Sequence, residues 1–138
     1  MQACRKMGEA TISIVLVDDQ ATVRRGLRMR LTIEADVEVV GEAGSGEAAL
    51  RLVRSLSPDV VLMDVEMPGM DGIDATAALR AAAPQVAVVV LSLYDDARTR
   101  ARAREAGAAA FVAKHQAKTA LLATIRRVVS SIEAGDTP

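Results

Sequence analysis

The sequence predicts an α/β fold with a doubly wound, five-stranded parallel sheet and five helices. An apolar, largely β-branched run is followed by a segment of helical character five times along the 138 residues. Four of these five runs end directly in a charged or hydroxyl residue. Regular alternation of strand and helix implies a parallel sheet with helices on both faces and right-handed crossovers. The length suits one ordinary domain.

The first strand and helix are predicted from an unbroken β-branched run and a helical apolar face. The strand is expected at Ile12–Val17. The helix is expected from about Ala21–Ile33, because Val23, Leu27 and Leu31 recur on one face.

The second unit is shorter and is bounded by turn residues. Val37–Val40 is predicted to be a strand, and Gly41–Gly46 is predicted to be a turn rather than a phosphate-binding loop. Ser45 can cap a helix that runs to about Leu56. Ser57-Pro58 then ends this helix.

The third unit contains the centre of the chain. Val60–Met63 has no polar alternation, which suits a strand covered on both faces, and Asp64 follows at once. The turn residues Met67-Pro68-Gly69 and Asp71-Gly72 indicate that the chain leaves the sheet there. A helix is expected over Gly72–Ala82.

The last two units complete the alternation. A strand is expected at Val86–Leu91, followed by a helix that opens at Asp95-Asp96 and ends at Gly107. A weaker strand is expected at Ala109–Ala113. The inner face of a final helix is marked by Leu121, Leu122, Ile125, Val128, Val129 and Ile132.

Composition narrows the class of protein. Aromatic residues make up only 1% of the chain, which argues against a single-stranded nucleic-acid platform, and the net charge of −1 gives no overall attraction to nucleic acid or membranes. The single cysteine, Cys4, cannot form an intramolecular disulfide. No signal peptide or membrane-spanning run is recognisable. A cytoplasmic location is expected.

Reactive side chains collect at the strand ends. They are Asp18, Asp19, Asp64, Ser92 and Lys114. The carboxyl ends of parallel strands lie on one edge of the sheet, so these side chains are expected to meet there. Three close carboxylates repel one another, and an oxygen-only ligand set with room for water suits Mg²⁺. Metal, ammonium and hydroxyl together can hold a phosphoryl group, with the carboxylate as nucleophile.

These residues and their neighbours resemble the receiver domain of two-component response regulators. The motifs are Asp18-Asp19, the stretch from Leu62 to Gly72, Leu91-Ser92 and the stretch from Phe111 to Lys114. The likeness covers roughly residues 11 to 132. It is nearest to the regulators with a C-terminal helix-turn-helix of the LuxR type (NarL/FixJ). The resemblance implies a flavodoxin-like strand order of 2-1-3-4-5.

The resemblance also implies roles for the metal and phosphoryl ligands. Asp64 is expected to be the phosphoacceptor and to bind Mg²⁺ together with Asp19 and the backbone carbonyl of Glu66. Asp18 is expected to act through a metal-bound water. Lys114 is expected to pair with the phosphoryl oxygens.

A second group of residues is expected to form the switch and to control access to the site. Ser92 would swing toward the phosphoryl group and Phe111 would then turn inward. Glu66 and Tyr94 would tune access of water. Lys114 is followed by His115 where many relatives have proline, so the family's cis peptide is not assumed.

The resemblance implies a signalling switch that responds to a sensor histidine kinase. Phosphorylation would alter the surface of the fourth helix, fifth strand and fifth helix, favour a homodimer and act on DNA through a C-terminal domain. Residues 1–10 would be an extension, 11–133 the receiver domain and 134–138 the start of a linker to an output domain absent from this chain. The domain would not be an enzyme beyond phosphorylating and dephosphorylating itself, and it would not bind membranes.

The sequence leaves two alternative interpretations open. An aspartyl-phosphate phosphatase would also use Asp64 as nucleophile, with Glu66 as proton donor. The paired Asp18-Asp19 on another strand favours a receiver.

The arginines of the first helix are expected to form a solvated face, with kinase docking as the alternative. They are Arg24, Arg25, Arg28 and Arg30.

Overall fold

The computed structural model describes residues 11–134. The predicted extension over residues 1–10 and residues 135–138 of the predicted linker lie outside this range. Five parallel strands form one sheet in the order β2-β1-β3-β4-β5, which confirms the predicted order. The strands are β1 (Ile12–Val17), β2 (Val37–Ala43), β3 (Val60–Asp64), β4 (Ala87–Ser92) and β5 (Ala110–Ala113).

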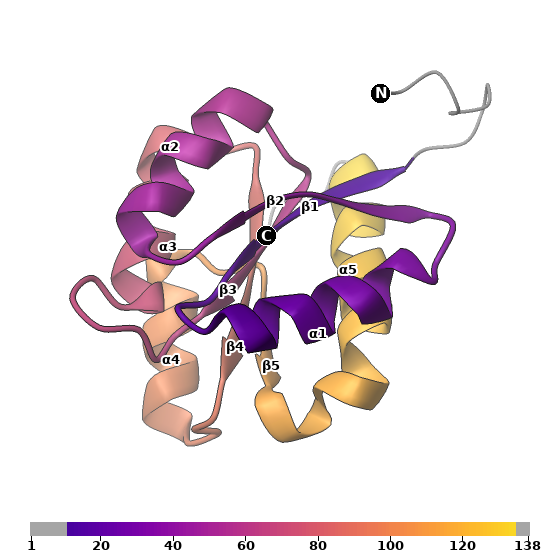
Figure 1. The fold of residues 1–138 in the computed structure, drawn as a ribbon. Helices are drawn as coiled ribbons and strands as arrows, with labels where there is room; N and C mark the ends of the chain where they lie inside the picture. The colour runs from indigo at the N-terminus through magenta and orange to yellow at the C-terminus, as the bar shows by residue number, and fades with distance from the viewer. Residues whose placement is uncertain (1–10, 135–138) are drawn as a thin grey trace.

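Helices cover both faces of the sheet, as predicted. They are α1 (Ala21–Thr32), α2 (Gly46–Leu56), α3 (Gly72–Ala82), α4 (Ala97–Ala106) and α5 (Ala117–Glu133). Figure 1 shows α2, α3 and α4 on one side of the strands and α1 and α5 on the other. No helix in the described range is long and apolar enough to cross a bilayer.

Strand side chains alternate between two cores, one beneath each helical layer. In β1, Val15 and Val17 face the core under α2, α3 and α4, whereas Ile14 and Leu16 face the core under α1 and α5. All four are at most 2% exposed. The buried sheet holds the strand ends in fixed positions, and these ends carry the polar residues.

The prediction that β2 ends at Val40 is wrong. Ile14 pairs with Val39 and Val15 pairs with Gly41, so Val40 is an extra, bulged residue of β2, and this strand continues through Gly41 to Ala43. A side chain at Gly41 would come within 2.9 Å of α2 leucine side chains. Gly41 therefore allows α2 to pack closely on the strand, and its presence does not mark a turn.

Most predicted element ends are confirmed through their capping contacts. The Ser45 side chain accepts a hydrogen bond from the Ala48 N–H at 3.1 Å. The Asp96 side chain accepts one from the Thr99 N–H at 3.1 Å. Gly107 follows α4 with φ of 100°, a left-handed conformation that favours glycine. The last helix differs slightly, because a 3-10 turn at Lys114–Gln116 precedes it.

Candidate functional site

The centre of the site is a carboxylate cluster at the carboxyl edge of the sheet. β2 and β3 lie on opposite sides of β1, so the ends of β1 and β3 flank the point where the strand order reverses. Asp18, Asp19 and Asp64 offer carboxylate oxygens that all lie within 4.8 Å of one another. Asp18 and Asp64 are only 3% and 1% exposed, while Asp19 is open to solvent. The predicted meeting of these residues is confirmed.

Lys114 brings a positive charge into this cluster from the end of β5. Its Nζ lies 2.6 Å from Asp64 Oδ1, 3.8 Å from Asp18 Oδ2 and 3.9 Å from Glu66 Oε1. The Glu66 N–H also donates to Asp64 Oδ1, at 3.3 Å. One ammonium cannot balance so many carboxylates, so the edge stays negative and attracts cations.

Burial and charge act in opposite directions on Asp64. Burial raises the pKa of Asp64 to about 6, and the charges of Asp18 and Glu66 add to this rise, while Lys114 opposes it. For Lys114, burial alone would lower the pKa. The hydrogen bond to Asp64 and the neighbouring carboxylates outweigh that effect, so the Lys114 pKa lies above its usual value.

Glu66 binds the end of the neighbouring strand through its side chain. The Ser92 hydroxyl donates to Glu66 Oε2 at 2.6 Å, and the Leu93 N–H donates to Glu66 Oε1 at 3.0 Å. This contact was not predicted from the sequence. A sequence signal for this contact does exist. β3 and β4 are parallel and Asp64 pairs with Leu91, so the residues that follow each of these two strands lie close together.

The loop after β3 is held against the phosphoacceptor candidate by a glycine. A Cβ on Gly72 would lie 2.0 Å from the carbonyl oxygen of Asp64. The Gly72 N–H donates to the Val65 carbonyl at 3.0 Å, and Asp71 caps α3 by accepting from the N–H groups of Ile73 and Asp74. The predicted turn residues thus fix how α3 approaches the site.

An arginine of α1 supports the loop that carries Asp18. Arg24 Nη1 donates to the Asp18 carbonyl at 2.5 Å, and Arg24 Nε lies 2.9 Å from Glu42 Oε1. Arg28 Nε pairs with the other Glu42 oxygen at 2.6 Å. Arg25 is exposed and Arg30 is partly exposed, as predicted for a solvated face, whereas Arg24 and Arg28 pair with Glu42 of β2.

Phe111 and Tyr94 lie around the cluster rather than within it. Phe111 is partly buried, and the Arg100 guanidinium of α4 lies 4.6 Å from the centre of its ring. Tyr94 is 62% exposed, and its N–H donates to the Ser92 hydroxyl oxygen at 3.0 Å. The hollow between α4 and β5, of about 210 Å³, is lined largely by alanines, which agrees with light packing of this helix.

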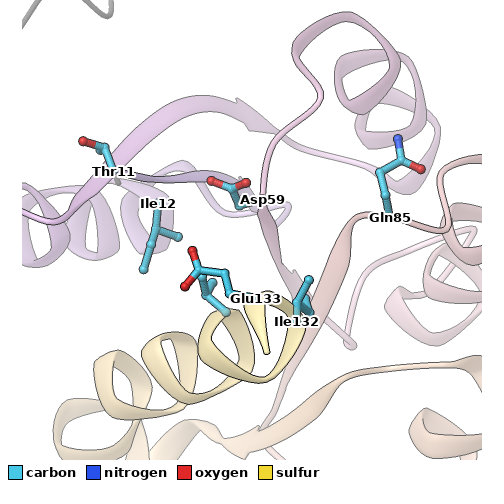
Figure 2. Close-up of a pocket in the computed structure, with 7 residues that line it drawn as sticks. Thr11, Ile12, Asp59, Gln85, Ile132 and Glu133 are labelled. Atoms are coloured by element: carbon cyan, nitrogen blue, oxygen red, sulfur yellow. The ribbon is translucent and has the colours of Figure 1, made fainter. Parts of the chain in front are cut away.

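A separate hollow lies at the opposite, amino edge of the sheet. It measures about 170 Å³, and its lining includes Thr11, Asp59, Gln85 and Glu133 (Figure 2). The Asp59 carboxylate is engaged there by the N–H and hydroxyl of Ser13, at 2.9 and 3.1 Å. This hollow contains none of the strand-end residues that form the carboxylate cluster.

The donor set of the cluster fits a hard divalent cation. All three side chains of the cluster are carboxylates, and the exposed Asp19 leaves an approach from solvent.

Residues 14–126 match the family model described as response regulator receiver domain. The chain belongs to this family. Receiver domains bind Mg²⁺ at such an acidic pocket and act as phosphorylation-dependent signalling switches.

Curated relatives of this receiver domain are bacterial response regulators. The response regulator GacA of Pseudomonas aeruginosa is 39% identical over 117 residues, which are 85% of this chain and 55% of that protein. The response regulator UvrY of Escherichia coli is 37% identical over 119 residues, with 86% and 55% covered. The chain spans about half the length of the curated relatives it matches.

Solved receiver structures share the fold. The signal receiver domain of the response regulator NarL from Mycobacterium tuberculosis is 34% identical with a TM-score of 0.82, covering 88% of this chain and 98% of that one. A LuxR-family response regulator from Aurantimonas sp. is 32% identical with a TM-score of 0.85, covering 93% and 89%. The flavodoxin-like receiver fold and the LuxR-family resemblance predicted from the sequence are both confirmed.

Proposed function

We propose that Asp64 is the phosphoacceptor of this receiver domain. A carboxylate oxygen of Asp64 would form a bond to phosphorus while the bond from phosphorus to a kinase histidine nitrogen breaks. The observation that carries this proposal is the 2.6 Å contact between Lys114 Nζ and Asp64 Oδ1, beside two further carboxylates. No described hydrogen bond engages Asp64 Oδ2, which suits attack by that oxygen.

The acidic cluster would hold the metal that accompanies phosphoryl transfer. We assign Asp19, Asp64 and the Glu66 backbone carbonyl as Mg²⁺ ligands and Asp18 as a partner of a metal-bound water. Mg²⁺ would neutralise charge that develops on the phosphoryl oxygens. Lys114 would move from Asp64 to a phosphoryl oxygen, where its ammonium keeps a charge-assisted contact.

Ser92 and Phe111 would convert the bound charge into a change of surface. The Ser92 hydroxyl would donate to a phosphoryl oxygen, and Phe111 would turn inward from beneath Arg100. The hollow beside Phe111 supports this, because its alanines Ala103, Ala108 and Ala109 leave space between α4 and β5. Tyr94 and Glu66 would control the approach of water.

We propose the partners of the switch from its family. A sensor histidine kinase would supply the phosphoryl group, and the altered α4-β5-α5 surface would favour a homodimer. DNA would be bound by a LuxR-type helix-turn-helix domain joined through a linker that starts near residue 134. The support is that the matched residues cover only 55% of each of these two curated relatives.

Phosphorylation by a small donor tests the central assignment. Incubation with acetyl phosphate and Mg²⁺ is expected to add the mass of one phosphoryl group to the wild type. The gain should be absent in Asp64→Asn and after chelation with EDTA. Asp74→Asn, at an exposed aspartate of α3, is the matched control and should be labelled normally.

Two outcomes would contradict the proposal. Labelling that persists in Asp64→Asn would place the phosphoryl group elsewhere. Many turnovers on small phosphate esters would instead support the phosphatase alternative. The engagement of the Glu66 carboxylate by Ser92 and Leu93 disfavours that alternative, since it points the predicted proton donor at the β4 end.

A further inference from the structure

The Glu66 side chain binds the two donors at the end of β4 at once. Its Oε2 accepts from the Ser92 hydroxyl and its Oε1 accepts from the Leu93 N–H. Ser92 is fully buried, whereas Leu93 is 63% exposed. One carboxylate therefore fixes both a buried hydroxyl and the first peptide of the exposed β4–α4 loop.

The Ser92 hydroxyl cannot serve two acceptors with its one proton. A serine hydroxyl has one O–H donor, and here that donor is directed at Glu66. The same oxygen also accepts a hydrogen bond from the Tyr94 N–H, so two contacts hold this hydroxyl in place. Any phosphoryl oxygen on Asp64 that takes the Ser92 proton must first displace Glu66.

Lys114 and the charge of the phosphoryl group add to this competition. Glu66 Oε1 lies 3.9 Å from Lys114 Nζ, the cation that would move to the phosphoryl oxygens. An aspartyl phosphate would also place further negative charge beside the Glu66 carboxylate, which like-charge repulsion opposes. The Glu66 side chain is 24% exposed, so it has a path toward solvent.

We propose that Glu66 is a latch that holds the β4 end in its unphosphorylated arrangement and must release Ser92 before the switch can close. This inference rests on the proposed function of Asp64 and adds a role for the Glu66 side chain beyond water access. Glu66 acts through Ser92 and the loop, so it is a positioning residue. Its removal should favour the anion-bound state.

Binding of beryllofluoride with Mg²⁺, a stable phosphoryl analogue, tests the latch in the intact chain. Loss of one charge-assisted hydrogen bond predicts roughly tenfold tighter binding in Glu66→Ala. Glu66→Asp keeps the charge but is one methylene shorter, so it should also bind more tightly. If charge repulsion alone operated, Glu66→Asp would match the wild type, and that result would overturn the latch.

A double mutant separates an effect through Ser92 from a general one. In a Ser92→Ala background, the gain from Glu66→Ala should shrink, because the hydroxyl that Glu66 holds is gone. An undiminished gain would overturn the proposal. A wild type that binds no beryllofluoride would instead overturn the proposed function itself, whereas unchanged Glu66 variants beside a binding wild type would overturn only the latch.

A second readout needs neither metal nor anion. The Leu93 N–H belongs to an exposed loop residue, and its described acceptor is Glu66. Amide hydrogen exchange at Leu93 should therefore accelerate by roughly tenfold or more in Glu66→Ala, while buried strand amides such as that of Val89 stay protected. Unchanged exchange at Leu93 would show that the contact does not hold the loop.

Discussion

Asp64 is buried beside other carboxylates, and its ionisation should therefore cost stability. Its pKa rises from 3.8 to about 6 in the fold. A carboxyl group whose pKa is raised by folding stabilises the protein while it is protonated, below the unfolded value. That contribution is lost as the pH rises through the folded value. In this protein the loss falls between about pH 4 and pH 6.

Asp64→Asn should be more stable than the wild type at pH 7.5 without Mg²⁺. The asparagine is neutral at every pH, so it avoids the buried charge. A rise of roughly two pKa units corresponds to about 3 kcal/mol, and this net rise already includes the opposing contact with Lys114, so a gain of about 2–3 kcal/mol is expected. Urea denaturation in EDTA at pH 7.5 and pH 4.5 measures this, and the gap should narrow to about a third at the lower pH.

The opposite order of stabilities would contradict this account of Asp64. If Asp64→Asn were less stable than the wild type at pH 7.5, the contact with Lys114 would outweigh the effect of burial. Asp74→Asn again serves as control. As an exposed surface change, it should alter stability by no more than about 0.5 kcal/mol.

At the scale of elements, the approach of α3 to β3 depends on one glycine. A Cβ at Gly72 would meet the Asp64 carbonyl oxygen at 2.0 Å, so the backbone must shift in Gly72→Ala. We expect a loss of about 1–3 kcal/mol in unfolding free energy and weaker Mg²⁺ binding. Urea denaturation and Mg²⁺ titration measure the two effects.

Gly26 is the matched control for this substitution. It lies inside α1, and a Cβ there would meet nothing within 4 Å. Gly26→Ala should stabilise the protein by about 0.5–1 kcal/mol, because alanine favours the helix interior. Equal effects of the two substitutions would show that helix propensity, and not the contact with Asp64, governs Gly72.

The elements show what local patterns can and cannot predict. Strand runs, caps and strand-end residues are local properties, so the sheet and the cluster of Asp18, Asp19, Asp64 and Lys114 could be predicted. The full length of β2 depends on a bulge at Val40, where its pairing with β1 skips one residue of β2. The Glu66 contact depends on side-chain conformation across two strands, and the Arg24 contact depends on how α1 packs. The position of a bulge, the conformation of a side chain between two strands and the packing of a helix all depend on contacts between distant segments, and the sequence of one segment does not contain them.

At the scale of the whole molecule, Arg126 joins distant parts of the chain. From α5 it donates to both Asp36 oxygens at 2.8 Å and to Glu34 Oε1 at 3.0 Å, in the connection between α1 and β2. The hydrogen bond to Arg126 lowers the pKa of Asp36. A lowered carboxyl pKa gives stability above the unfolded value of 3.8 that is lost as the pH falls below it.

Arg126→Ala should therefore reduce stability slightly near pH 6 at low salt. The groups are exposed, so screening should remove the difference from the wild type in about 1 M NaCl, and acid below the Asp36 pKa should also remove it. Thermal denaturation across salt and pH measures this. Arg127→Ala, at a neighbouring exposed arginine with no described ion-pair partner, should show no such dependence. A salt-independent loss would indicate packing instead.

Tyr94 has one further consequence, for spectroscopy. It is the only tyrosine in a chain without tryptophan, so ultraviolet emission from this protein arises almost entirely from one ring. That ring is 62% exposed, and the peptide that carries it is bonded to the Ser92 hydroxyl. The unlabelled wild type thus contains a single tyrosine whose N–H is bonded to the proposed switch residue Ser92, and its emission is expected to change when that contact changes.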